Sequence, residues 1–459
     1  ELMIMPDLKK LEKKHLITKV YDCCCGTGGM LSVTKELISE KTKQKPDAYL
    51  FGQELNAATY AMCKADMLIK GEDPNNIKGG EKDHSAASTL SNDQFFDENF
   101  DYLITNPPYG TDWKKDKEAV LRESERGFAG RFGAGVPRIS DGQLLFLQHM
   151  VSKMRSEKDG GARLAIIFNG SPLFTGDAGS GESEIRRWIF EKDLLEAIVA
   201  LPDQLFYNTG INTYVWLLSN RKDARRTGKV QLIDARTFFE KRRKSLGNKR
   251  NDIGVSGREK ILELYEGFAE GEHSKIFQTT DFAFRQITIE RPLRLSFDMT
   301  HEKLTELAPI LGKVGSALKC KKWQSREKFV ADITATRINL TKGELKKVID
   351  TVGIRDENAE ICKDASGNPE PDSELRDTEN VPWGTDVYAY FKKEVKPYAL
   401  DAWLNESIKD EKDNKIGKVG YEIPFTRFFY QYEPPRELGD VEGDIEKVEN
   451  ELLALLKQL

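Results

Sequence analysis

The stretch between residues 19 and 43 constrains the fold more than any other part of the sequence. A short apolar run at residues 19–23 is followed by a turn with three glycines, and then by apolar residues at helical spacing up to Lys43. Glycine lets the chain turn sharply and lets a ligand approach the backbone closely. A strand, a glycine turn and a helix in this order open a doubly wound α/β sheet. The sequence therefore predicts an α/β domain with a ligand at the end of its first strand.

The turn itself has the pattern acid-x-x-x-Gly-x-Gly, which begins at Asp22. A dinucleotide site would need a third glycine at the position of Leu31, so the turn does not fit that class. The pattern resembles the first motif of S-adenosylmethionine methyltransferases, in which the turn lies against the methionine part of the cofactor and the acid faces its ammonium group. The resemblance implies that S-adenosylmethionine is bound by Asp22, Cys25, Gly26, Thr27, Gly28 and Gly29. A glycine-rich turn without a ligand is the alternative.

A carboxylate ends the second strand candidate, residues 48–53. Glu54 follows the glycine turn by the distance at which an acid accepts hydrogen bonds from the ribose hydroxyls of a nucleoside. Methyltransferases often place another acid further on, where it bonds the cofactor's adenine amine. Here that position holds Ser88, and Asp66 and Asp93 are only weak substitutes, so the adenine contact is left unassigned.

A four-residue polar motif follows the apolar run at residues 100–105, which predicts a buried strand. The side-chain oxygen of Asn106 and the carbonyl oxygen of Pro107 can each accept a hydrogen from an amine. Pro107 and Pro108 fix φ and supply no competing N–H group, so they keep the acceptors in place. Tyr109 offers an aromatic face on which a flat base can stack. The alternative is a tight turn without a catalytic role, because Asn and Pro are common in turns.

The motif resembles the catalytic motif of amino-group DNA methyltransferases, in which S-adenosylmethionine methylates a flipped adenine. The resemblance implies catalytic roles for Asn106, Pro107, Pro108 and Tyr109, with Asn106 also beside the cofactor. The adenine amine is a poor nucleophile because its lone pair is delocalised, and two acceptors would draw it towards tetrahedral geometry. The same residues also serve methylation of cytosine N4, of RNA and of protein glutamine, so these acceptors stay as alternatives.

Four more strand candidates occupy residues 163–169, 195–201, 212–219 and 229–234. Together with the first three they predict a Rossmann-like, mostly parallel seven-stranded sheet, with five parallel strands and a terminal antiparallel pair, as in class I S-adenosylmethionine-dependent methyltransferases. We expect the catalytic domain at residues 19–290 and a mainly helical region for subunit assembly at 291–459. Residues 1–18 are expected to be the remnant of a missing amino-terminal region, because Glu1 stands within what looks like the end of a helix. Residues 7–18 are expected to form a short helix that leads into the first strand.

Five longer stretches extend the likeness along the chain: residues 133–141, 169–187, 201–210, 375–382 and 420–427. They resemble the modification subunit of type I restriction–modification systems. The resemblance implies an adenine N6-methyltransferase that acts on double-stranded DNA with a separate specificity subunit and, in the larger complex, a restriction subunit. That family normally has an amino-terminal helical domain and a further cofactor motif before the first strand. Since neither is found here, an assembly scaffold with a weak cofactor site is a second alternative.

Composition limits the partners and the compartment. The formal net charge of −5 argues against tight binding of duplex DNA by this chain alone. No apolar run reaches the length of a membrane-spanning helix. Three of the six cysteines are consecutive, an arrangement that suits neither a disulfide among them nor a metal site. The sequence therefore predicts a cytoplasmic protein without a bound metal.

Four further segments carry weaker predictions. Residues 110–141 are polar and rich in glycine, and we expect a mobile flap over the flipped base, with a solvated loop as the alternative. The basic run at residues 241–250 is expected to be a solvated helix face, with DNA backbone contact as the alternative. Residues 355–382 are expected to form a long loop or linker. A heptad stripe near the end of the chain is expected to pack against helices of the specificity subunit: Val441, Ile445, Val448, Leu452, Leu455 and Leu459.

Overall fold

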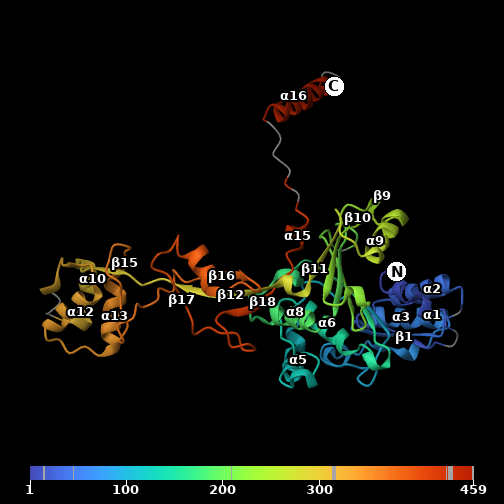
Figure 1. Ribbon diagram of the computed structural model, residues 1–459, viewed down its shortest axis with the longest axis horizontal. Helices are drawn as coiled ribbons and strands as arrows, with labels where there is room; N and C mark the ends of the chain where they lie inside the picture. Colours follow the sequence, from blue (N-terminus) through green and yellow to red (C-terminus); the bar gives the residue numbers. More distant parts are fainter. Residues whose placement is uncertain are drawn as a thin grey trace.

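Nine strands form one sheet in the first of three bodies that lie in a row (Figure 1). The computed structural model describes residues 1–13, 16–44, 46–207, 209–312, 317–430, 432 and 438–456. The strands of the large sheet are β1 (Thr18–Asp22), β2 (Ala48–Glu54), β3 (Ile77–Gly79), β4 (Tyr102–Thr105), β5 (Arg163–Phe168), β6 (Leu195–Ala200), β7 (Tyr214–Ser219), β8 (Lys229–Asp234) and β11 (Ser274–Gln278).

The strand order of this sheet is β11-β8-β6-β7-β5-β4-β1-β2-β3. Strand β7 runs antiparallel to both of its neighbours, β5 and β6, and β11 runs antiparallel to β8. The other pairs are parallel. The predicted class I methyltransferase fold is therefore confirmed. The sheet has nine strands where seven were predicted, and the antiparallel strands are β7, between β5 and β6, and β11 at one edge, not a terminal pair. Strands β3 and β11 were not among the predicted ones.

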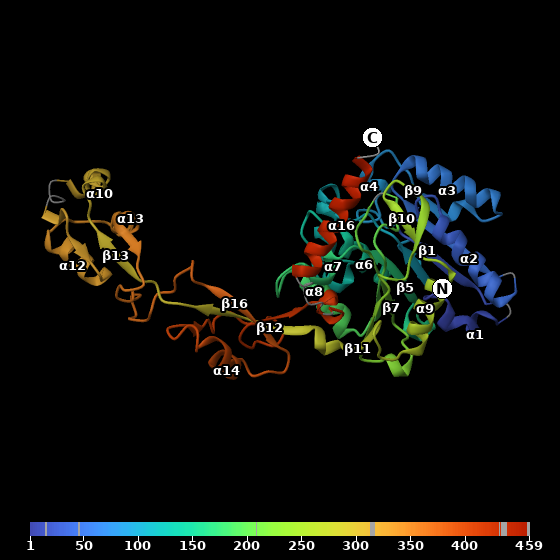
Figure 2. The same cartoon turned by 90° about the horizontal axis from the view of Figure 1, so that it is seen from above.

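Helices cover both faces of the sheet, which is why its central strands are almost entirely apolar (Figure 2). Alternate strand residues face opposite sides, so Val20 packs with one set of helices and Tyr21 with the other. The first set is α2 (Gly29–Thr42), α3 (Ala57–Ile69) and α9 (Val255–Gly267), and the second is α6 (Gln143–Ser152) and α8 (Gly181–Glu191). Shorter helices are α1 (Leu8–Leu11), α4 (His84–Ala87), α5 (Lys117–Ser124) and α7 (Ser171–Phe174).

Residues 1–13 contain less helix than expected. The chain begins with turns, continues through a 3-10 helix (Met5–Asp7), and forms only the single turn α1 before the first strand. Part of the predicted helix, residues 14 and 15, lies outside the described residues.

The segment at residues 110–141 is folded, so the alternative of a solvated loop is wrong, while the expected flap motion stays a prediction. It contains α5 and packs Trp113, Val120 and Phe132 into a small core of its own. The half-buried guanidinium of Arg131 donates to the carbonyl oxygens of Thr89 at 2.6 Å and Leu90 at 2.9 Å. These contacts join residues far apart in the sequence, so local periodicity could not predict them.

A second, four-stranded antiparallel sheet is built around β12 (Ala283–Glu290). Its other strands are β16 (Asp377–Pro382), β17 (Trp403–Leu404) and β18 (Lys418–Tyr421). Helix α14 (Val387–Tyr390) and a π-helix (Phe391–Val395) pack against this sheet, whereas α15 (Phe425–Phe428) packs into the core of the first body. The end of the predicted catalytic domain thus lies in this second sheet, and part of the predicted linker at 355–382 is the strand β16.

The third body joins a small sheet to four helices around Phe297 and Phe329. Its elements are β13 (Leu295–Asp298), β14 (Lys322–Trp323), β15 (Gly353–Arg355), α10 (His301–Glu306), α11 (Ala308–Leu311), α12 (Arg326–Ala335) and α13 (Lys342–Val352). The region after residue 290 was expected to be mainly helical, but it also contributes strands to two sheets.

The last helix is α16 (Leu438–Leu456), and it carries the predicted heptad stripe. Val441, Ile445, Val448 and Leu452 are all exposed. Leu459 and the side chain of Leu455 lie outside the described residues. Among the described helices, none combines the length and the hydropathy that a bilayer span requires.

The basic run at residues 241–250 is a β-hairpin, so the expectation of a helix is wrong. Strand β9 (Glu240–Leu246) pairs with β10 (Lys249–Asp252) in an antiparallel ladder with an irregular register. Charged residues of this kind fit an exposed strand as well as an exposed helix, so the local sequence did not decide between them.

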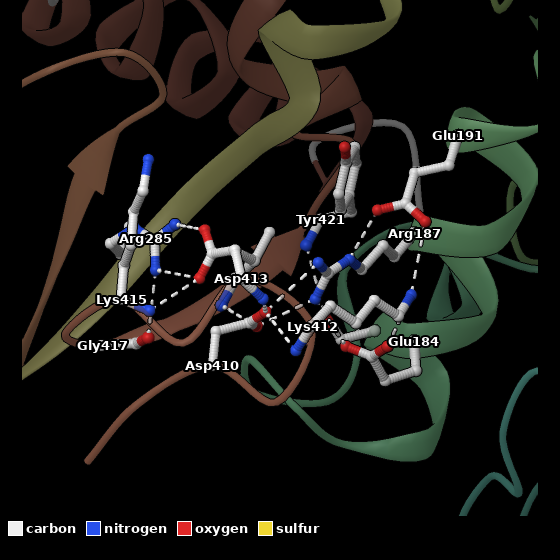
Figure 3. Close-up of polar contacts among 12 residues, drawn as sticks. Glu184, Arg187, Glu191, Arg285, Asp410, Lys412, Asp413, Lys415, Gly417 and Tyr421 are labelled. Carbon is white, nitrogen blue, oxygen red and sulfur yellow. Dashed lines mark hydrogen bonds and ion pairs between the residues drawn. The ribbon is translucent and has the colours of Figure 1, made fainter. Parts of the chain in front are cut away.

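A buried ion pair joins the second sheet to helix α8 (Figure 3). Arg187 donates to Asp410 Oδ2 at 2.9 Å and to Oδ1 at 3.3 Å. The two side chains are only 6% and 5% exposed. Although burial opposes ionisation of the carboxyl, the bonds from Arg187 and from the Val419 N–H lower the pKa of Asp410 to about 2.

We expect Arg187→Met to lower the free energy of unfolding by about 3 kcal/mol, because it leaves a buried carboxylate without its cation. Calorimetry of the full chain measures the shift of the transition. The control is Lys328→Met, which removes a cation from the exposed pair with Glu360 and should leave the transition in place. Equal transitions for the wild type and Arg187→Met would contradict this role of the pair.

Candidate active site at the carboxyl edge of the sheet

The glycine turn and the Asn-Pro-Pro-Tyr motif meet at one edge of the large sheet. Strands β1 and β4 are parallel neighbours, with Val20 opposite Tyr102 and Tyr21 opposite Leu103. Their carboxyl ends therefore deliver Asp22 and Asn106 to the same place. The hydroxyl of Thr105, the residue before Asn106, donates to Asp22 Oδ1 at 2.7 Å and ties the two motifs together.

Asp22 is a buried carboxyl, 2% exposed. Its Oδ1 also accepts the backbone N–H of Cys24 at 3.0 Å, while its Oδ2 has no hydrogen-bond donor among the described residues. Burial raises the pKa of Asp22 to about 7, and the bonds from Cys24 and Thr105 only partly offset that effect. A cationic group placed beside Oδ2 would find an acceptor there.

The glycine turn keeps one side open. Gly26 and Gly28 have φ angles of 54° and 81°, a left-handed backbone conformation that residues other than glycine rarely adopt. A Cβ at Gly28 would lie 2.8 Å from both Cys63 Sγ and Met67 Cε, so α3 closes that side. A Cβ at Gly26 or Gly29 would have nothing within 4 Å. The backbone of the turn is therefore accessible to a ligand.

Two other predicted residues of the turn differ in exposure. Thr27 is exposed, whereas Cys25 is buried with its Sγ 4.0 Å from Cys63 Sγ. The thiol of Cys25 thus packs against α3, and only its backbone faces the turn.

Glu54 connects the end of β2 to the glycine turn. Its Oε2 accepts the N–H of Gly26 at 2.8 Å, and its Oε1 accepts the N–H of Asn56 at 2.7 Å. A carboxylate has about four acceptor positions, so two of them are left for further donors. Since the side chain is only half-buried, a pair of hydroxyls can reach it.

The substitutes considered for the adenine contact are engaged elsewhere. Asp93 is buried in an ion pair with Lys153, and Asp66 pairs with Lys70 on the surface of α3 at 2.9 Å. Ser88 is 5% exposed, and its hydroxyl accepts the N–H of Leu90 at 3.3 Å. The contact with the cofactor's adenine is thus left unassigned.

The Asn-Pro-Pro-Tyr motif forms one wall of a cavity of about 590 Å³, a size common for small-molecule sites. Pro107 is buried and Pro108 is exposed. The hydroxyl of Tyr109 donates to Asn106 Oδ1, so an incoming amine has to replace this bond. Burial raises the pKa of Tyr109, so this hydroxyl stays neutral. The cavity is lined by Asn106, Pro107, Pro108, Tyr109, Gly110, Asn169, Phe206, Tyr207, Thr209 and Ile211.

The rest of the lining consists of residues for which the sequence predicted no site role. Asn169 directly follows β5, and its Oδ1 accepts from Gln143 Nε2 at 3.1 Å and from the N–H of Ser171 at 2.9 Å. Phe206 and Tyr207 come from the loop after β6. The sequence contained one signal for Asn169. It directly follows β5, the strand next to β4, just as Asn106 directly follows β4.

Neither this edge nor the rest of the described chain holds a group of three or more side chains that could bind a metal ion. The six cysteines are free thiols. The site therefore offers carboxylates, amide and carbonyl acceptors and aromatic faces as its chemical groups.

Comparison with known proteins gave three kinds of likeness. The family described as N-6 DNA Methylase matches residues 4–288. The type I restriction enzyme MjaIX methylase subunit of Methanocaldococcus jannaschii is 23% identical over 336 residues, which are 73% of this chain and 56% of that protein. The MjaVII methylase subunit of the same organism is 30% identical over 258 residues, 56% of this chain and 41% of that protein.

A crystal structure of the type I restriction-modification system methyltransferase subunit from Streptococcus thermophilus is also similar. It shares 25% sequence identity, has a TM-score of 0.49, and aligns over 61% of this chain and 55% of its own. The chain spans about half the length of the curated relatives that it matches.

Proposed function

The chain belongs to the N-6 DNA methylase family, and from this premise we propose that it transfers a methyl group from S-adenosylmethionine to the N6 amine of adenine in double-stranded DNA. The observation that carries the proposal is the bond between Thr105 and Asp22. It holds the amine acceptor Asn106 next to the glycine turn, so a cofactor on the turn and a base in the cavity are neighbours. Bringing two reactants together in this way removes much of the barrier to their reaction.

The residues present fit the cofactor. Its ammonium group would lie at Asp22, its ribose hydroxyls at Glu54, and its methionine part along the open side of Gly26 and Gly29. When bound, the cofactor supplies an electrophilic methyl group on a positively charged sulfur. The glycine-turn motif in the sequence and the positions of Asp22 and Glu54 beside that turn both support this placement.

The flipped base would occupy the cavity beside Tyr109. Asn106 Oδ1, released by the Tyr109 hydroxyl, and the carbonyl oxygen of Pro107 would accept the two amine hydrogens. These acceptors withdraw the nitrogen lone pair from the ring and make it available for attack. No general base has to act first, because the amine proton becomes acidic only as the new bond forms.

We further propose that the chain works in the cytoplasm within a larger complex that has a specificity subunit and a restriction subunit. The net charge of −5 supports a partner that contributes to DNA contact. The exposed apolar residues of α16 support helix packing against such a partner. The free thiols fit a reducing compartment.

Calorimetric titration with S-adenosylmethionine, without and with the specificity subunit and duplex DNA, tests the proposal. We expect binding in both cases and methyl transfer only in the complete mixture. Mass spectrometry of the digested DNA then identifies the product. N4-methylcytosine instead of N6-methyladenine would overturn the acceptor, and a folded chain that binds no cofactor under either condition would leave a scaffold role.

A pH dependence of cofactor binding follows from Asp22. Because burial raises the pKa of Asp22 to about 7, the carboxyl is largely protonated below that pH and loses its attraction for an ammonium group. The dissociation constant should be constant above about pH 8 and should rise roughly tenfold per pH unit well below pH 7. Titrations between pH 5.5 and 8.5 measure it. Asp22→Asn should bind weakly with no such dependence, and a pH-independent wild type would contradict the assignment.

A further inference from the structure

The hairpin of β9 and β10 is joined to the loop that lines the proposed base cavity. The N–H of Asn248 donates to the carbonyl oxygen of Tyr207 at 3.0 Å, and the N–H of Arg250 donates to that of Gln204 at 2.9 Å. Lys249 Nζ lies 5.5 Å from the centre of the Tyr207 ring. Since Tyr207 is a cavity residue and is 60% exposed, the hairpin borders the mouth of the cavity.

The root of this hairpin is fixed, whereas its strands are open to solvent. Asn251 is 5% exposed, and its Nδ2 donates to the carbonyl oxygen and to Oδ1 of Asp203, both at 3.1 Å. Figure 1 shows β9 and β10 beyond one end of the large sheet, next to α9. The hairpin is thus held in place at the cavity loop and presents its remaining surface to solvent.

The hairpin carries a local positive charge on an acidic protein. Residues 240–252 include six basic and two acidic side chains, a net charge of +4, while the whole chain has −5. Asp252 pairs with Arg242 and Lys249, and Glu240 stands at the start of β9. Four basic side chains are exposed and have no hydrogen bond or ion pair with any described residue: Lys241, Arg243, Lys244 and Arg250.

We propose that this hairpin binds the phosphate backbone of the DNA strand that carries the target adenine. The inference rests on the proposed function. Flipping takes the base into the protein but leaves the phosphates on either side of it outside. Cations at the cavity mouth neutralise those phosphates and release condensed counterions, which strengthens binding without reading sequence. The four cations without partners are the groups that do this.

The test compares two triple variants of the full chain, together with its specificity subunit. One is Arg243→Ala, Lys244→Ala and Arg250→Ala on the hairpin. The control is Lys342→Ala, Lys346→Ala and Lys347→Ala, which removes the same charge from exposed positions on α13. Affinity for a duplex oligonucleotide is measured at several salt concentrations, beside the cofactor affinity and the kcat and KM for DNA.

For the hairpin variant we expect about tenfold to hundredfold weaker DNA binding near 0.1 M salt, and a slope of log affinity against log salt that is smaller by about 2 to 3. Cofactor affinity and kcat at saturating DNA should be unchanged, and the control should match the wild type. Arg243→Lys with Arg250→Lys should retain the wild-type slope, since these changes keep the charge.

Equal slopes for the hairpin variant and the control would overturn the inference. Loss of binding to the specificity subunit with intact DNA affinity would overturn it as well, because the cations would then serve a protein partner. If the wild type methylates DNA normally and the hairpin variant binds DNA as well as the wild type, only this inference is wrong. If the wild type neither binds nor methylates DNA, the proposed function is wrong as well.

Discussion

Replacing Asn106 by alanine is expected to slow methyl transfer by about a thousandfold and to leave cofactor affinity nearly unchanged. The change removes the side-chain acceptor that would draw the amine out of conjugation, an interaction that strengthens only as the transition state forms. The glycine turn and Glu54 are bonded to each other and not to Asn106, so the cofactor site keeps its shape. Single-turnover transfer of labelled methyl groups and calorimetric titration of the cofactor measure the two effects separately.

Asn106→Asp is the matched variant for this experiment. It keeps an oxygen acceptor at nearly the same position but adds a negative charge, so we expect activity between that of the wild type and that of Asn106→Ala. If Asn106→Ala retained most of its activity, the proposed mechanism would be wrong. If it instead lost cofactor binding, Asn106 would belong to the cofactor site alone.

Replacing Glu54 by alanine should have the opposite effect, with about hundredfold weaker cofactor binding and a kcat within severalfold of the wild type at saturating cofactor. Two hydrogen bonds from ribose hydroxyls to a carboxylate are lost. Bonds to a charged acceptor contribute about 1.5 kcal/mol each at the lower end of their range, and two such bonds account for about a hundredfold. The comparison of kcat with the cofactor KM separates this binding role from a role in the reaction.

The control has to separate ribose binding from damage to the turn, since Glu54 also holds the N–H of Gly26 and that of Asn56. Asn56→Ala provides it, because it removes the cap of α3, in which Asn56 accepts the N–H of Ala58 at 2.9 Å. This variant should lower the melting temperature and leave cofactor affinity largely unchanged. A similar loss of affinity in both variants would mean that the loss comes from disturbing the segment between β2 and α3 and not from lost ribose bonds.

Patterns between neighbouring residues were enough to predict the α/β class and most strands of the large sheet. The strand before Gly26 and the strand before Asn106 each ended where a local polar motif began, and both were found close to the predicted place. The residues proposed for the site come from these two motifs and from Glu54, and they lie along one edge because parallel strands end together. Their roles stay predictions until the variants above are measured.

The predictions that were wrong concern segments whose structure depends on distant partners. The basic run became a hairpin because Lys241 pairs with Asn251 and the carbonyls of Gln204 and Tyr207 receive its backbone donors. Residues 377–382 became a strand because β12, far earlier in the chain, offered an edge. No periodicity within either segment encodes these partners.

The sequence by itself determined the chemistry that this protein can offer, since an acid beside a glycine turn and an Asn-Pro-Pro-Tyr loop after a buried strand are local arrangements. Only the tertiary structure decided what surrounds that chemistry. It placed Asn169 and Tyr207 in the lining of the same cavity as Asn106, and it attached a basic hairpin to the cavity loop. Contacts between residues far apart in the sequence form only when the whole chain closes around its core, and short-range patterns carry little information about them.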